Sequence, residues 1–396
     1  MSDGRGVTFA RGFTAGAISA GVKTVVPERL DVALIASDRA CVAAGVFTTN
    51  EVIAAPCVVS QRHLAHGTLR AIVVNSGNAN ACTGAQGERD AEAMTAAAGR
   101  LLGIHAVDVA VGSTGVIGVP LPAGLIGDAI AKLRLSVEGW DAASRAILTT
   151  DTRPKVTERE VALSAGSVRI GGVAKGAGMI HPNMATLLAF VTTDAVIDAA
   201  LLQGIVSSGV RDSFNAISVD GDTSTNDTLL VLANGASGVA VTGADRAVFG
   251  AALTEVCAEL ARMIVADGEG ATKVFEVLVR GAASEADARV AARTVTTSNL
   301  VKTAIHGADP NWGRILAAAG RSGARLDART ATVRIGDVVV YESGTPRPVD
   351  LERVRKVFEG KLIPIVVELG LGSGTARAWG TDLSAEYVRI NADYTT

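Results

Sequence analysis

Short apolar runs bounded by glycine, asparagine or aspartate recur along the chain, and this pattern predicts strands. Residues 156–172 also alternate with period two on both sides of a turn near Gly166. The strands expected on these grounds are 31–38, 41–50, 70–74, 108–112, two within 156–172, 187–191, 227–235, 271–282, a hairpin at 331–344, 363–370 and a last one within 378–396.

Apolar residues spaced three and four apart predict helices between these strands. The helices expected are 90–102, 121–133, 140–148, 196–208, 245–264, segments within 295–320, and 351–358 with Asp350 as its N-cap. Strands and helices mix without strict alternation. The pattern therefore favours an α+β fold in layers, with helices on the outside of β-sheets.

Composition supports a well-packed enzyme-sized protein. The chain has 396 residues, 48% of them hydrophobic and only 4% aromatic, with 44 glycines. Such a chain can bury a large core, and its small residues let backbones approach closely. The net charge is −3 without a long basic run, so a nucleic-acid surface is disfavoured and a small-molecule substrate is expected.

Cysteine usage and the N-terminus indicate a cytoplasmic protein. The four cysteines, Cys41, Cys57, Cys82 and Cys257, form no CxxC pair, and three of them lie in apolar or small-residue stretches that suit reduced, buried thiols. MSDGRGVTFARGF lacks the apolar core of a signal peptide, and no apolar run is long enough for a membrane span. Neither a membrane nor a nucleic acid is an expected partner.

Familiar cofactor and metal motifs are absent. The sequence contains no GxGxxG after a strand, no P-loop, no HExxH and no GxSxG, and its five histidines are dispersed. No metal and no resident cofactor are expected. Asp220, Asp222 and Asp227 suggest a cation site, but capping of turns and loops is the better interpretation.

The segment KGAGMIHPNMAT (175–186) combines three features that suit self-cleavage. A glycine-rich stretch precedes Ala185, a hydroxyl residue (Thr186) follows it, and an apolar strand begins at once. Glycine permits the strained backbone that an attack of the Thr186 hydroxyl on the Ala185 carbonyl requires. Hydrolysis of the resulting ester would leave Thr186 with a free α-amino group.

A free α-amino group would make Thr186 a competent nucleophile. A hydroxyl needs an adjacent base, and an α-amino group has a reference pKa of about 7.8 against about 10.4 for lysine. Much more of it is therefore neutral at pH 7. Taken alone, a threonine at the start of an apolar run is also an ordinary strand residue.

AKGAGMIHPNMATLLAF (174–190) resembles the cleavage and nucleophile signature of the ornithine acetyltransferase family, also called bifunctional glutamate N-acetyltransferases of arginine biosynthesis. Seven further segments resemble family segments in the same order, over essentially the whole chain: VVNSGNANACTG (73–84), GSTGVIG (112–118), TTDT (149–152), SFNAISVDGDTSTND (213–227), DGEGATK (267–273), HGADPNWGR (306–314) and NADYTT (391–396).

The resemblance implies roles for individual residues. Thr186 would be the nucleophile and Ala185–Thr186 the cleaved bond, while Thr114 and Gly115 would form the oxyanion hole. The implied substrate contacts are Thr149, Lys175, Thr186, Glu269, Asn391 and Thr396. Thr152 is the alternative to Thr149, because TTDT offers several threonines.

The implied reaction is a ping-pong transfer of acetyl from N2-acetylornithine to glutamate through acetyl-Thr186, and some family members also use acetyl-CoA as donor. The implied fold is a sandwich of β-sheets flanked by helices, ornithine acetyltransferase / DmpA-like. Residues 1–185 and 186–396 would be intertwined alpha and beta chains rather than domains, assembled as α2β2. A self-processing aminopeptidase or amidase and an uncleaved binding protein are the alternatives.

Overall fold

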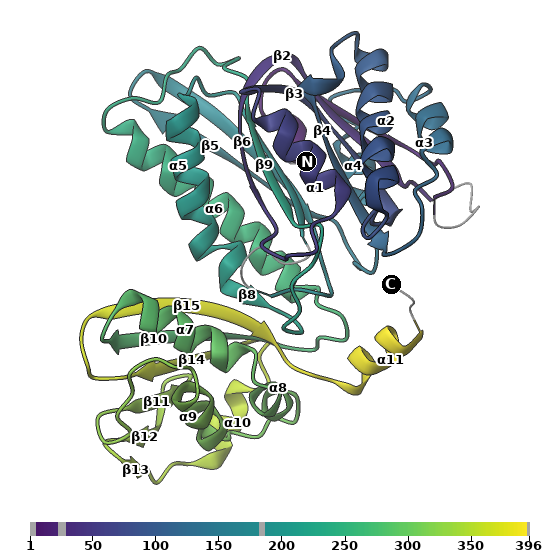
Figure 1. The fold of residues 1–396 in the computed structure, drawn as a ribbon. Coiled ribbons are helices and arrows are strands. Elements are labelled where there is room, and N and C mark those ends of the chain that lie inside the picture. Colours follow the sequence, from purple (N-terminus) through teal and green to yellow (C-terminus); the bar gives the residue numbers. More distant parts are fainter. Residues whose placement is uncertain (1–4, 23–28, 182–186, 394–396) are drawn as a thin grey trace.

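Two β-sheets covered by helices form the part of the protein that the computed structural model describes, residues 5–22, 29–181 and 187–393 (Figure 1). The first, eight-stranded sheet has the order β4-β3-β2-β9-β7-β6-β5, with β1 paired to β2. The second, seven-stranded sheet has the order β13-β12-β11-β14-β10-β15-β8. Both sheets mix parallel and antiparallel pairs, so the predicted α+β class is confirmed.

The first sheet and its helices come mainly from the first two thirds of the chain. Their bounds are β1 (Phe13–Ile18), β2 (Val32–Phe47), α1 (Ala55–Leu64), β3 (Thr68–Asn78), α2 (Gly84–Leu102), β4 (Val109–Val116), α3 (Ala123–Ile130), α4 (Trp140–Ala146), β5 (Lys155–Leu163), β6 (Gly166–Lys175), β7 (Leu188–Thr193), α5 (Ala199–Gly209), β9 (Thr228–Ala233) and α6 (Asp245–Ala266).

The second sheet and its helices follow, apart from one short strand that precedes β9. Their bounds are β8 (Ile217–Ser218), β10 (Val274–Ala282), α7 (Glu285–Thr296), α8 (Asn299–His306), α9 (Trp312–Gly320), β11 (Thr332–Ile335), β12 (Val338–Glu342), β13 (Thr345–Pro346), α10 (Leu351–Val357), β14 (Leu362–Glu368), β15 (Gly374–Thr381) and α11 (Ala385–Asp393).

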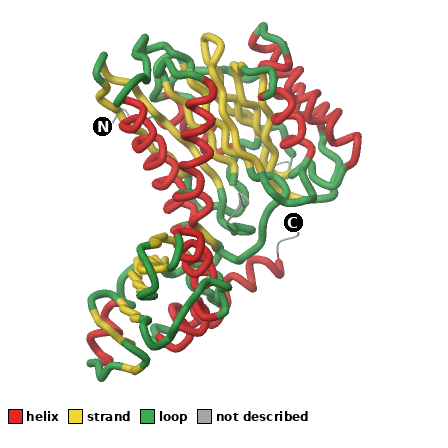
Figure 2. Tube along the Cα trace, turned by 60° about the vertical axis from the view of Figure 1, so that its left-hand side comes forward, coloured by secondary structure: helices red, strands yellow, loops and turns green. Residues whose placement is uncertain are grey.

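The first sheet folds over on itself within β2. The register with β3 is interrupted between Ala36 and Cys41; the first half of β2 pairs with β1, the second half pairs with β9, and β3 pairs with residues on both sides of the interruption. The two halves then face each other, since a Cβ added at Gly112 of β4 would lie 3.4 Å from the Phe190 ring of β7. The result is a sandwich with helices on both outer faces (Figures 1 and 2).

Alternating side chains along the strands build three apolar layers. Ile35 of β2 and Phe190 of β7 belong to the core between the sheet halves. Leu34 faces the layer under α2 and α3, and Val191 faces the layer under α5 and α6. This period-two alternation is what a strand buried on both faces requires.

The second sheet is covered on one face by alanine-rich helices. Ala288, Ala291 and Ala292 of α7 pack with Val277 and Val279 of β10 in a core of their own. Small side chains let the helix approach the sheet closely. The opposite face carries charge, as where Arg377 lies 3.4 Å from Glu276. The α6–β10 connection and the β8–β15 pairing join this part to the sandwich.

Two strand predictions need correction. The runs 31–38 and 41–50 form one bent strand, β2, because the polar residues between them make an irregularity rather than a turn. The last strand, predicted within 378–396, ends at Thr381 and is followed by helix α11. Across the described ranges, no helix combines the length and apolar character needed to cross a bilayer.

Candidate active site

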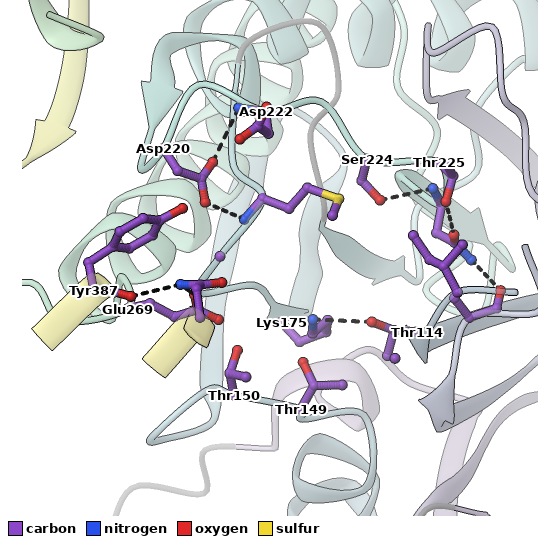
Figure 3. Close-up of a pocket in the computed structure, with 17 residues that line it drawn as sticks. Thr114, Thr149, Thr150, Lys175, Asp220, Asp222, Ser224, Thr225, Glu269 and Tyr387 are labelled. Atoms are coloured by element: carbon purple, nitrogen blue, oxygen red, sulfur yellow. Dashed lines mark hydrogen bonds between the residues drawn. The ribbon is translucent and has the colours of Figure 1, made fainter. Parts of the chain in front are cut away.

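A cavity of about 160 Å³ lies where β4 and β6 end, against the loop that precedes β9 and beside helix α11 (Figure 3). Five of the residues implied by the resemblance line it: Thr114, Gly115, Thr149, Lys175 and Glu269, with Asn391 of α11 as a sixth. The segments that supply them are up to 277 positions apart in sequence, and the fold brings them together.

Thr114 and Gly115 stand at the end of β4, which runs parallel to β3. Gly115 has φ +133°, and an added Cβ would lie 2.3 Å from the carbonyl carbon of Gly77, so only glycine fits there. Asn226 fixes the same loop by donating to the carbonyls of Ala79 (2.6 Å) and Ser113 (2.9 Å). This rigid turn therefore places the Thr114 side chain and the Gly115 backbone at the cavity wall.

Lys175 is buried at the end of β6 and points toward Thr114 at the end of β4. Its Nζ donates to Thr114 Oγ1 at 3.2 Å and lies 3.8 Å from Asp151 Oδ2. Because Thr114 Oγ1 accepts this bond, its own proton remains available to a ligand in the cavity. The lysine therefore orients the threonine as a donor.

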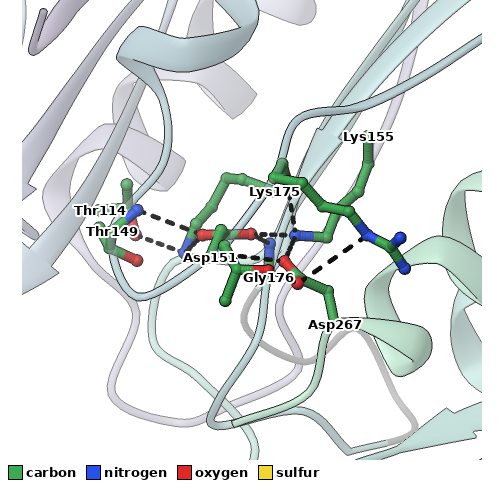
Figure 4. A network of polar contacts seen from close by, with 9 residues as sticks. Thr114, Thr149, Asp151, Lys155, Lys175, Gly176 and Asp267 are labelled. Atoms are coloured by element: carbon green, nitrogen blue, oxygen red, sulfur yellow. Dashed lines mark hydrogen bonds and ion pairs between the residues drawn. The ribbon is translucent and has the colours of Figure 1, made fainter.

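Lys175 belongs to a buried group of two lysines and two aspartates, whose other members are Lys155, Asp151 and Asp267 (Figure 4). Lys155 Nζ, with no exposed surface on its side chain, donates to Asp151 at 2.6 Å and to Asp267 at 2.5 Å. The N–H of Gly176 donates to Asp151 at 2.7 Å. The four charges cancel, which is how ionised groups are tolerated in an interior.

Ionisation within this group follows from burial and pairing. Burial disfavours the charged form of Asp151, but Lys175, Lys155 and the Gly176 N–H outweigh it and lower the pKa of Asp151 to about 2. Burial also lowers the pKa of Lys175, against the opposing charge of Asp151. Asp151 is thus an anion at any physiological pH.

The opposite side of the cavity is acidic. Glu269 follows α6, and its Oε2 accepts a hydrogen bond of 2.8 Å from Asn391 Nδ2. A Cβ at Gly178 would lie 2.4 Å from that same Oε2, so glycine lets the carboxylate approach the backbone. Asp220 and Tyr387 lie on this side as well (Figure 3).

Asp227 anchors the start of β7. It is fully buried, and its Oδ1 accepts the Leu187 N–H at 2.9 Å. Burial raises the pKa of Asp227 well above the usual range of an aspartate. The residues predicted to be cleaved, Ala185 and Thr186, and the predicted ligand Thr396 lie outside the described residues.

Comparison with known proteins gives the family. A model of the ArgJ family matches residues 14–396. The chain belongs to the ArgJ family. Arginine biosynthesis bifunctional protein ArgJ of Symbiobacterium thermophilum is 48% identical over 396 residues, covering 99% of this chain and 98% of that protein.

Two solved structures are similar to this ArgJ chain. The crystal structure of arginine biosynthesis bifunctional protein ArgJ from Bacillus halodurans is 45% identical with a TM-score of 0.51, over 52% of this chain and 98% of that chain. The ornithine acetyltransferase of Mycobacterium tuberculosis, complexed with ornithine, is 36% identical with a TM-score of 0.42, over 48% of this chain and 98% of that chain.

In the structure of this chain, the two threonine candidates, Thr149 and Thr152, lie in different surroundings. Thr149 lines the cavity, as does Thr150. Thr152 instead donates its N–H (3.0 Å) and its hydroxyl to Asp267, and it is not among the lining residues. Of the two candidates, Thr149 is therefore the one that lines the cavity.

Several polar residues of the ArgJ site were not singled out as site residues from the sequence. Asp151 lies within TTDT, Lys155 lies three residues after it, and Tyr387 lies in the segment predicted as a strand. Asp220 and Asp227 were interpreted as capping residues, and both do accept backbone N–H groups. No group of three or more His, Cys, Asp or Glu placed to hold a metal occurs in the described part of the chain.

Proposed function

We propose that this protein transfers an acetyl group from N2-acetyl-L-ornithine to L-glutamate in arginine biosynthesis, by a ping-pong mechanism through acetyl-Thr186. One observation carries the proposal. This chain belongs to the ArgJ family, and its fold brings Thr114, Gly115, Lys175, Glu269 and Asn391 together around one cavity. Lys175, which lines the cavity, pairs across the sheet with Leu188, the first residue of β7, and Thr186 precedes that strand by two positions in sequence.

The cavity supplies a role for each group in the first half-reaction. The Thr186 hydroxyl attacks the acetyl carbonyl, and the α-amino group of the same residue takes the proton. The Thr114 hydroxyl and the Gly115 N–H stabilise the oxyanion; one such donor contributes about 3 kcal/mol to transition-state stabilisation. Ornithine leaves with a proton on its α-nitrogen, and the acetyl group stays on Thr186 as an ester.

The second half-reaction runs the same steps in reverse with another amine. The α-amino group of glutamate attacks the ester, and N-acetylglutamate leaves. Lys175 pairs with the α-carboxylate that both amino acids carry, while Glu269 pairs with the ammonium of ornithine. Thr149, Asn391 and Thr396 complete the proposed substrate contacts with neutral hydrogen bonds.

Cleavage of the Ala185–Thr186 bond belongs to the same proposal, because it creates the α-amino base. Residues 1–185 and 186–396 are then the alpha and beta chains, assembled as α2β2. The Bacillus halodurans ArgJ chain, about half as long as this one, supports cleavage near the middle.

The buried thiols of Cys41, Cys57 and Cys257 suit a cytoplasmic location.

Trapping the covalent intermediate tests the proposal. The enzyme is mixed with N2-acetylornithine labelled in the acetyl group, denatured, and its fragments are separated. Label on Thr186 of the C-terminal fragment, chased into N-acetylglutamate by unlabelled glutamate, is the expected result. Acetyl transfer without any label on Thr186 would contradict it.

Acetyl-CoA is a second candidate donor, because the curated relatives are named bifunctional. The expected product from glutamate is again N-acetylglutamate. The rate with acetyl-CoA, measured beside the rate with N2-acetylornithine on the same preparation, decides whether this chain has both activities.

A further inference from the structure

The cavity carries opposite charges at its two sides. Among the described residues that line it, Lys175 is the only basic one, whereas Asp220, Asp222 and Glu269 are acidic. Lys175 stands beside Thr114, where the acetyl group reacts (Figure 3). The acidic side is where the far end of an amino-acid substrate lies if its α-carboxylate pairs with Lys175.

The two proposed substrates place opposite charges at that far end. Ornithine carries an ammonium after three methylene groups, and glutamate carries a carboxylate after two. Both must present the α-nitrogen to the same acetyl carbon, so both terminal groups reach the same place. The carboxylates of the cavity attract the ammonium of ornithine. They repel the side-chain carboxylate of glutamate unless one of them takes up a proton.

Asp220 is the carboxylate fixed most firmly at this place. It accepts the N–H groups of Met179 (2.5 Å), Ile180 (2.9 Å) and Asp222 (3.2 Å). Because three backbone donors hold it, it cannot swing away from an anionic ligand. Glu269 has a longer side chain, and its contact is the exposed amide of Asn391.

The groups around Asp220 act on its charge in both directions. Burial together with the charges of Asp222 and Glu269 outweighs the backbone bonds and raises the pKa of Asp220 to about 6. Tyr387 interacts with it from α11, and Lys302 faces it from α8, bonded to the Val219 carbonyl at 2.6 Å. Asp220 is therefore still mainly ionised at pH 7.5, but it takes up a proton more readily than an ordinary aspartate does.

We propose that Asp220 lets one pocket accept both substrates by exchanging a proton with solvent. Charged, Asp220 pairs with the ammonium of ornithine or N2-acetylornithine. Protonated, it donates a hydrogen bond to the side-chain carboxylate of glutamate. The proton enters with glutamate and returns to solvent when N-acetylglutamate leaves, so the reaction remains balanced. This inference rests on the proposed function.

Calorimetry on the wild-type enzyme tests the proton exchange directly. L-Glutamate and L-ornithine are each titrated into the processed enzyme at pH 7.5, without an acetyl donor, in two buffers of different ionisation enthalpy. Glutamate is expected to bring close to one more proton onto the enzyme than ornithine does. Comparing the two amino acids cancels proton changes at their α-amino groups. Equal proton uptake for both would overturn the proposal.

Two matched variants assign the proton to its residue. Asp220→Asn is expected to abolish the difference in proton uptake. It should lower kcat/KM for ornithine, measured as exchange of label with N2-acetylornithine, by about 10- to 100-fold. The value of kcat/KM for glutamate should change by less than about threefold. Asp141→Asn removes the same charge from an exposed position that does not line the cavity and should keep the uptake difference. An equal loss for both substrates in Asp220→Asn would refute the assignment.

The outcomes separate this inference from the proposed function. If the wild-type enzyme moves no acetyl group from N2-acetylornithine to glutamate, the function itself fails. If it does so without the difference in proton uptake, the role of Asp220 alone fails. The calorimetric result on the wild-type enzyme decides the matter even if Asp220→Asn does not fold.

Discussion

Asp151 is the residue on which the charge balance of the site depends. It pairs with both Lys155 and Lys175, and its side chain is fully buried. Asp151→Asn leaves the two lysines with Asp267 alone. Removing one partner of a buried ion pair destabilises a protein by about 3–5 kcal/mol, and that loss is the expected result in urea unfolding at pH 7.

The same variant has a predictable pH dependence. The pKa of Asp151 is lowered from 3.8 to about 2 on folding, so its stabilising contribution is present above pH 3.8 and is lost as pH falls through 2. The gap in unfolding free energy between wild type and variant should therefore narrow at acid pH. Asp141→Asn, which breaks an exposed pair with Arg145, serves as control and should change stability by less than about 1 kcal/mol.

Gly115→Ala tests the oxyanion hole. A Cβ there would lie 2.3 Å from the Gly77 carbonyl carbon, so the end of β4 must move away from β3. We expect kcat to fall by about 100-fold or more, as when an oxyanion donor is lost. Gly118→Ala is the matched control: it has φ +80° and no atom within 4 Å, and should cost about 1–2 kcal/mol of stability with little effect on kcat. Equal effects of the two variants on kcat would contradict the assignment.

Resemblance predicted the residues that face the cavity, but not those that support them. Thr114, Gly115, Thr149, Lys175, Glu269 and Asn391 were expected together and do line one cavity. Asp267, by contrast, meets Lys155 across 112 positions of sequence. A buried ion pair leaves no pattern in the chain, because its partners are chosen by the fold and not by spacing.

At the scale of elements, apolar runs located most of the strands, but they did not predict strand β1 or helix α1, and they placed a strand where helix α11 forms. Tyr, Val and Ile between 387 and 390 favour a strand by propensity. In the structure Tyr387 and Asn391, four positions apart, face the cavity from α11, while Arg389 pairs with Glu386 at 2.5 Å. The contacts of Tyr387 and Asn391 with the cavity, including the bond from Asn391 to Glu269, hold this segment as a helix. Residue propensity does not take such tertiary contacts into account.

Helix α11 is expected to serve binding more than stability. None of its residues is buried, yet two of them line the cavity. A chain ended after Ser384 keeps the bond from Ser384 to the Gly270 carbonyl and should unfold within a few degrees of wild type. It should lose about 100-fold or more in kcat/KM for N2-acetylornithine.

Val388→Ala is the control for this deletion. Val388 is 64% exposed on the outer face of α11, so neither stability nor kcat/KM should change noticeably. A truncated enzyme with wild-type kcat/KM would show that α11 takes no part in binding.

At the scale of the whole molecule, the predicted cleavage falls inside a sheet and not between domains. Strand β7 begins two residues after Thr186 and pairs with β6 on one side and β9 on the other. The β6–β7 and β2–β9 pairings both join residues on either side of the cut. Separating the two pieces would expose strand edges and the core between the sheet halves, so the cut chain should stay together.

This arrangement makes cleavage visible only under denaturing conditions. The wild-type protein should give two bands on a denaturing gel, with Thr186 as the first residue of the second, and one species in native size-exclusion chromatography. Thr186→Ala lacks the attacking hydroxyl and should remain one band. Thr186→Ser keeps a hydroxyl at the same position and should still be cut, which separates loss of the nucleophile from loss of folding. A wild-type chain that stays intact and still transfers acetyl at full rate would mean that a base other than a freed α-amino group activates the nucleophile.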